Sequence, residues 1–118
     1  MKSLKIINEI AQAIYDKKGF NILALDVKGI SSITDYIIIA EGSVERHVKA
    51  IADEIIDRLK KIGERPLYIE GLQEADWIVI DYLNIMVHLF KPDLREKYNL
   101  EKLYNNSKII NLDIKLED

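Results

Sequence analysis

The 118-residue sequence contains no cysteine, only two prolines and five glycines, and no long apolar run. The lack of cysteine excludes a disulfide framework, a thiolate zinc site and a cysteine nucleophile. No apolar stretch approaches the roughly 20 residues that a membrane-spanning helix needs, and polar residues interrupt the N-terminal segment where a signal peptide would have its apolar core. We therefore expect a cytoplasmic protein.

Positive charge is slightly outnumbered: 17 Lys and Arg residues stand against 20 Asp and Glu residues, which gives a formal net charge of −3. This balance argues against a protein that grips nucleic acid mainly through its phosphates, and it favours a basic protein partner. Hydrophobic residues make up 48% of the chain and charged residues 31%. Such a composition is typical of a folded domain, and the length of the chain, 1–118, fits one domain.

Helical and strand patterns alternate along the chain. Apolar residues at helical spacing predict helices over residues 4–17 and 44–62, and Gly63 suits the C-terminal cap of the second helix. The run YIIIA is apolar on both faces, as in a strand at the middle of a sheet. Further strands are predicted over 21–27, 67–70, 77–82 and 85–90, the last two as a hairpin, and a short helix follows Pro92. The pattern predicts an α/β fold with a mixed sheet of about five strands flanked by helices.

The end of the chain alternates strictly between apolar and polar side chains from Ile110 to Glu117. This alternation predicts one more strand. Its setting is open: the strand pairs with a sheet edge of its own domain or of a second copy, or it is frayed in the monomer.

The residues that usually carry chemistry form no catalytic or metal-binding pattern. The two histidines, His47 and His88, lack a second ligand at the spacing of a helical metal site. No serine stands in a nucleophile-elbow pattern. His88 lies between apolar residues of a predicted strand, where we expect a hydrogen-bonded histidine on the less buried face. The sequence predicts no catalytic residue, no metal and no cofactor.

The corner Gly42-Ser43 leads into the second helix, for which Ser43 is a suitable N-cap. Arg46, His47 and Lys49 follow near the first turn, where the helix dipole disfavours cations. The free backbone N–H groups at the start of a helix, with cations nearby, can bind an anion. The cations therefore form either a recognition patch or an ordinary solvated helix face.

Trp77 and Asp81 share one side of a predicted strand, because side chains two residues apart point the same way. A face that carries both is not buried throughout. With Tyr82, and with Glu70 and Gly71 on the preceding strand and loop, they suit a protein-binding surface. In the alternative, both residues have only a structural role: Trp77 fills the end of the sheet, and Asp81 leads into the turn.

Four linked stretches between about residues 4 and 104 carry a resemblance: SSITDYIIIAEGSVERHVKAIADEI, Pro66 with Glu70-Gly71, WIVIDYLNIMVHLF and REKYNLEKLY. In their order and spacing they resemble the ribosomal silencing factor family, the bacterial relatives of the plant protein Iojap. The resemblance implies a nucleotidyltransferase-like scaffold that catalyses nothing. Such proteins bind a large-subunit ribosomal protein on the intersubunit face, and they repress translation by blocking the joining of the small subunit.

Carried onto this sequence, the resemblance implies a partner-binding surface that includes Glu70, Gly71, Trp77, Asp81, Tyr82, His88 and Arg95. A second recognition patch would meet adjacent rRNA phosphate or the other copy of a homodimer, through Ser43, Arg46, His47 and Lys49. Leu83 stands where the family usually has Gly, and Tyr104 where it usually has Trp. The tail from about residue 105 lies outside the resemblance.

Two alternatives remain. The first is an assembly factor of the large subunit that uses the same surface during maturation. The second is a divergent nucleotidyltransferase that holds Mg²⁺ with Glu70 and Asp81.

Overall fold

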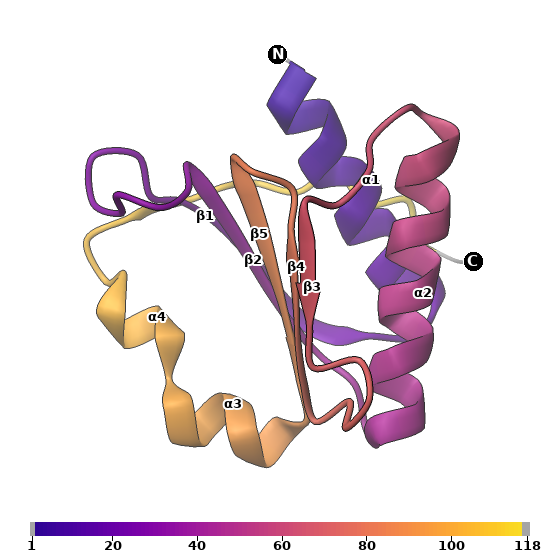
Figure 1. Cartoon of the computed structure of the whole chain (residues 1–118). Coiled ribbons are helices and arrows are strands. Elements are labelled where there is room, and N and C mark those ends of the chain that lie inside the picture. Colours follow the sequence, from indigo (N-terminus) through magenta and orange to yellow (C-terminus); the bar gives the residue numbers. More distant parts are fainter. Residues whose placement is uncertain (1, 117–118) are drawn as a thin grey trace.

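The computed structural model describes residues 2–116. Its elements are α1 (Lys2–Asp16), β1 (Phe20–Asp26), β2 (Tyr36–Glu41), α2 (Glu45–Lys61), β3 (Tyr68–Glu70), β4 (Trp77–Asp81), β5 (Ile85–Phe90), α3 (Pro92–Tyr98), α4 (Leu100–Leu103) and β6 (Lys108–Ile109). The strands form one sheet in the order β3-β4-β5-β2-β1-β6, with β2 and β5 parallel and the other neighbours antiparallel. Figure 1 shows α1 and α2 on one side of the sheet and α3 and α4 on the other. The predicted mixed α/β fold is confirmed, with the two-residue β6 added to the five expected strands.

The central position of β2 follows from its composition. All six of its residues are buried. Ile38 and Ala40 pack in the core beneath α1 and α2, whereas Ile37 and Ile39 pack in the smaller core beneath α3 and α4. A strand covered on both faces must be largely apolar, as the sequence predicted for the run YIIIA. None of the helices in the described part of the chain is long and apolar enough to cross a membrane.

The N-cap of helix α2 lies one residue later than predicted. Val44 occupies the N-cap position and makes no side-chain cap, so the prediction that Ser43 is the N-cap is wrong. The backbone N–H of Ser43 instead donates to Nδ1 of His47, at 2.9 Å. At the other end Gly63 has φ +85° and its N–H donates to the Lys60 carbonyl, which confirms the predicted left-handed cap.

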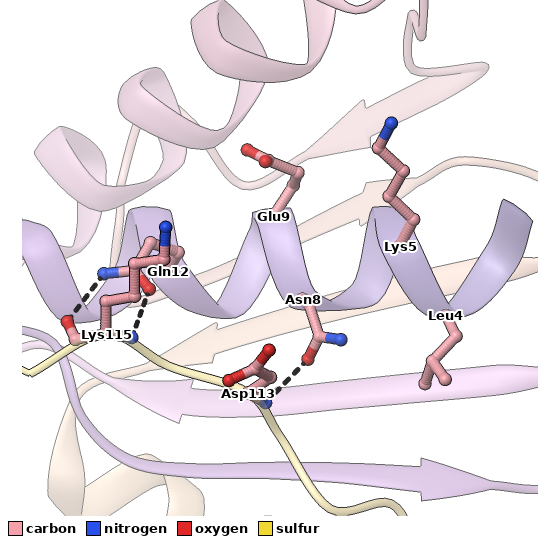
Figure 2. Close-up of a pocket in the computed structure, with 7 residues that line it drawn as sticks. All are labelled: Leu4, Lys5, Asn8, Glu9, Gln12, Asp113 and Lys115. Atoms are coloured by element: carbon pink, nitrogen blue, oxygen red, sulfur yellow. Dashed lines mark hydrogen bonds between the residues drawn. The ribbon is translucent and has the colours of Figure 1, made fainter.

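Within the described residues the tail is a strand only at Lys108–Ile109, which pair with β1, so the strand predicted from Ile110 onward is wrong. Beyond the bond from the Ile110 N–H to the Ala24 carbonyl, the edge of β1 becomes irregular, with Asn21 at φ +52°. The tail then leaves the sheet and runs along α1, as Figure 2 shows. Glu117 lies outside the described residues.

Two side chains of α1 replace the missing strand partner. Oδ1 of Asn8 accepts from the Asp113 N–H at 2.9 Å, and Gln12 bonds both the N–H and the carbonyl of Lys115, at 2.7 and 3.1 Å. Ile110 and Leu112 meanwhile pack against the main core. The predicted alternation therefore serves packing onto a helix as well as a sheet edge.

We expect the double substitution Asn8→Ala and Gln12→Ala to lower the free energy of unfolding by about 1–2 kcal/mol, because three hydrogen bonds to the tail are lost. It should also make the peptide bond after Lys115 easier for trypsin to cleave, since Gln12 holds the backbone of that residue. Urea unfolding and timed proteolysis measure the two effects. Lys5→Ala on the same helix is the control, and a double variant as stable and as protected as Lys5→Ala would contradict the prediction.

Candidate functional site

Helices α3 and α4 cover only part of their side of the sheet. Leu94, Leu100 and Tyr104 pack on a cluster contributed by β1, β2, the end of β5 and Val27, which consists of Leu25, Val27, Ile37, Ile39 and Phe90. On β4 the side chains that face this way stay partly exposed, whereas Ile78 and Ile80, which face α1 and α2, are fully buried. The outer half of this sheet face therefore remains open.

The strand register sets which side chains meet there. Glu70 is paired with Val79 and Val79 with His88, while Tyr68 is paired with Asp81 and Asp81 with Met86. Directly paired residues lie on the same side of a sheet. We call this surface the open face; it comprises Tyr68, Glu70, Trp77, Val79, Asp81 and Met86, with His88 and Phe90 at its inner margin.

Trp77 is held by aromatic neighbours while part of its ring stays accessible. The ring stacks on Phe90 with centroids 4.9 Å apart and lies against Tyr98 at 4.8 Å. Its Nε1–H donates to Nδ1 of His88 at 3.2 Å. Neither Trp77 nor Asp81 is sealed inside the fold. A rigid, partly exposed tryptophan is what an interface anchor requires, since little side-chain entropy remains to be lost on binding.

His88 accepts a hydrogen bond on the less buried side of its strand, as predicted, although its own side chain is buried, with 8% exposure. The physical reason is Trp77, whose ring lies over it with centroids 6.1 Å apart. Burial lowers the pKa of His88 to about 4. The imidazole is therefore neutral at pH 7, and because Nδ1 accepts the tryptophan N–H, its own proton is on Nε2.

The two predicted carboxylates both lie on the open face, each with a local partner. Oδ1 of Asp81 accepts from the Leu83 N–H at 2.8 Å, and Oε1 of Glu70 accepts from the Tyr68 hydroxyl at 2.7 Å. That bond and the charge of Glu70 raise the pKa of Tyr68. Glu70 and Asp81 belong to different rows of the register, and residues 2–116 contain no cluster of three or more potential metal ligands.

Gly71 and Tyr82 support the open face from behind. Gly71 has φ +84°, and a Cβ there would lie 2.1 Å from the Trp77 carbonyl oxygen, so only glycine allows this close approach. Tyr82 points to the opposite side and packs in the main core. Burial, with a smaller contribution from the charge of Glu64, raises the pKa of Tyr82 to about 12.

Arg95 lies in a nearly buried ion-pair network at the start of the α3–α4 segment. Its guanidinium contacts Glu41 at 3.0 Å and Glu101 at 3.2 Å, and it donates to the Asn21 carbonyl. The side chains of Arg95 and Glu41 are only 11% and 9% exposed. Arg95 therefore fixes α3 against the end of β2.

Sequence reasoning missed three aromatic and apolar members of the site: Met86, Phe90 and Tyr98. The strand alternation of 85–90 already placed Met86 and Phe90 beside His88. Tyr98, which is 47% exposed, comes from a helix that only the tertiary fold brings next to Trp77.

The second predicted patch is only partly a free surface. His47 joins two segments, because Nδ1 accepts from Ser43 and Nε2 donates to the Lys17 carbonyl at 2.7 Å. Lys49 lies 3.6 Å from Asp53, and Arg46 is exposed. The corner adjoins α3 through the ion pair between Glu45 and Lys91, at 3.2 Å.

We expect His88 to make the fold sensitive to acid. Because the folded pKa is about 4 and the unfolded value 6.5, stability is full above pH 6.5 and falls as the pH drops toward 4. At pH 5 the loss from this group is about 2 kcal/mol. His88→Gln keeps an acceptor for Trp77 and does not titrate, so urea unfolding at pH 7.5 and pH 5 should give a smaller difference for the variant. Equal differences would contradict the prediction.

Known proteins match nearly the whole length of this chain. The family model described as ribosomal silencing factor during starvation, RsfS, matches residues 1–118. The ribosomal silencing factor RsfS of Bacillus subtilis is 40% identical over 113 residues, which cover 96% of this chain and 96% of that protein. A crystal structure of a Chromobacterium violaceum protein superposes with a TM-score of 0.83 at 29% identity, covering 94% of this chain and 92% of that one.

Two relatives come from organelles. The mouse protein named mitochondrial assembly of ribosomal large subunit protein 1 is 29% identical over 83% of this chain and 44% of its own length. The chloroplast protein Iojap of Arabidopsis thaliana is 31% identical over 94% of this chain and 46% of its own length. The resemblance seen in the sequence is confirmed: the chain belongs to the RsfS family of ribosomal silencing factors, regulators of translation that are associated with the ribosome.

Proposed function

We propose that the open face docks on a large-subunit ribosomal protein at the intersubunit face, in the cytoplasm, and that the bound chain blocks the small subunit by occupying its space. The observation that carries this proposal is the half-covered sheet face on which Trp77 is held rigid and partly exposed beside two carboxylates. A mechanism by occupation requires no reacting group. It requires a stiff surface.

The residues divide into contacts and supports. Trp77 is the anchor, and Glu70 and Asp81 meet basic side chains of the partner, which suits a chain of net charge −3. His88 and Gly71 hold Trp77 from beneath and from the preceding loop. Tyr82 and Arg95 support the open face indirectly: Tyr82 packs in the main core, and Arg95 holds α3 in place.

A second candidate function is assembly of the large subunit, which the name of the mouse relative favours. The same face would serve it, because docking on a ribosomal protein is common to both roles. The two differ in when binding occurs: during maturation of the subunit or on the finished particle.

We expect Trp77→Ala to weaken binding to purified Bacillus subtilis large subunits about thirtyfold or more, as for an interface anchor. Glu70→Lys should weaken it about tenfold, whereas the matched charge reversal Glu74→Lys, at an exposed residue of the following loop, should have a smaller effect. Co-sedimentation gives the affinities, and circular dichroism at the same temperature checks that each variant is folded.

The blocking step has its own readout. Native protein should reduce the formation of 70S particles from purified subunits, and Trp77→Ala should not. Undiminished joining with saturating native protein, combined with immature large subunits in cells that lack it, would reject silencing in favour of assembly. Undiminished binding by folded Trp77→Ala would reject the docking face itself.

We further propose that Arg46 and Lys49 contact rRNA phosphate beside the protein partner, because their corner adjoins α3 through the Glu45–Lys91 ion pair. The double variant Arg46→Gln and Lys49→Gln should keep its stability, weaken binding at low salt and make the affinity less dependent on salt. Affinities at two or more salt concentrations measure this. An unchanged affinity and salt slope would assign both cations to a solvated helix face.

A further inference from the structure

The turn between β4 and β5 has a leucine in a backbone conformation that favours glycine. Leu83 has φ +81°. The N–H of Asn84 donates to the Tyr82 carbonyl at 3.1 Å, across Leu83. A positive φ at the centre of such a three-residue turn is the rare, strained form of the γ-turn. A β-carbon makes this conformation costly, whereas glycine adopts it freely.

The surrounding structure holds the turn in this shape. Oδ1 of Asp81 accepts from the Leu83 N–H at 2.8 Å. The carbonyl of Asn84 accepts from the N–H groups of Asp35 and Tyr36, at 3.2 and 3.0 Å, and its side chain donates to the Ser3 hydroxyl at 3.1 Å. The strained turn is thus tied to the open face, to the loop before β2 and to α1.

The leucine side chain adds little packing to the isolated fold. It is 70% exposed. Ile33, which is 73% exposed, lines the same shallow depression of about 240 Å³. Single exposed apolar residues are ordinary, but an exposed apolar residue that also strains its backbone is not. We call Ile33 and Leu83 the hairpin-tip patch.

We infer that the hairpin-tip patch is a second anchor for the protein that docks on the open face, an inference that rests on the proposed function. Two side chains cannot form an interface alone, because stable interfaces bury on the order of 1,000 Å² or more. The patch must therefore extend a larger surface, and Asp81 joins it directly to the open face. Its occupant is an apolar part of the same ribosomal protein, next to the basic side chains that face Glu70 and Asp81.

The position of the patch fits this role. In Figure 1 the turn between β4 and β5 lies at the opposite end of these strands from α3. Tyr98 and Trp77 therefore mark one end of the open face, and Leu83 marks the other. Anchors at both ends fix the orientation of a docked partner as well as its affinity.

The test separates fold from contact, because the two respond in opposite directions. Leu83→Gly should raise the melting temperature by about 4 °C through relief of the strained φ. The same variant should weaken binding to purified Bacillus subtilis large subunits about tenfold, since a leucine side chain is no longer buried. Leu83→Asn, which tolerates positive φ and keeps a β-carbon, should lose as much affinity, and Leu83→Met should retain it.

Two controls accompany these variants. Lys18→Gly relieves a φ of +66° on an exposed residue and should stabilise the fold in the same way. Leu116→Asn removes an equally exposed leucine, 72%, from the tail along α1 and should leave binding unchanged.

The outcomes are distinct. Native affinity in Leu83→Gly and Leu83→Asn, with binding lost in Trp77→Ala, would overturn the second anchor and leave the docking face intact. Native affinity in Trp77→Ala would overturn the docking face instead. A change of oligomeric state in the Leu83 variants at native ribosome affinity would assign the patch to a second copy of the chain and reject the inference.

Discussion

The nearly buried ion pair between Arg95 and Glu41 determines where α3 lies, and the shape of the open face depends on it. Glu41 ends the strand β2, and Arg95 lies in α3, 54 residues later in the chain. The ion pair therefore joins two segments that are far apart in the sequence. Either charge alone would be strongly unfavourable at this depth, so the two are held together with Glu101 and the Asn21 carbonyl. Because α3 is fixed there, Tyr98 reaches the Trp77 ring while β3 and β4 stay uncovered.

The same arrangement explains why a partly exposed tryptophan is compatible with a stable fold. Trp77 packs on Phe90 and Tyr98, and its N–H is satisfied by His88, so only the remaining part of the ring is left for a partner. The histidine accepts this bond because it is neutral, which its burial ensures. Preorganisation of this kind lowers the entropy lost on binding, which is what the proposed docking through Trp77 requires.

Sequence patterns predicted what depends on neighbours along the chain. The triple isoleucine gave a strand buried on both faces, the stripe of Val48, Ile51 and Ile55 gave an amphipathic helix, and alternation put Trp77 beside Asp81. What the sequence did not predict depends on distant contacts. The burial of His88 and Arg95, the contact of Tyr98 with Trp77 and the path of the tail along α1 all require partners brought together only by the fold. Ser43 was misassigned because its hydroxyl lies 3.2 Å from Nδ1 of His47 and caps no backbone N–H, while the helix begins after Val44.

The departure at Leu83 shows how sequence and structure inform each other on function. From the sequence alone, leucine in a two-residue turn indicates only a longer turn or accepted strain. In the structure Leu83 has a strained, positive φ. Hydrogen bonds hold the turn in place, and the leucine side chain is largely exposed to solvent. Glycine would adopt this φ freely, and the loss of a side chain that is 70% exposed would cost the fold little contact. The strained, exposed Leu83 is therefore the observation on which the inferred second anchor rests.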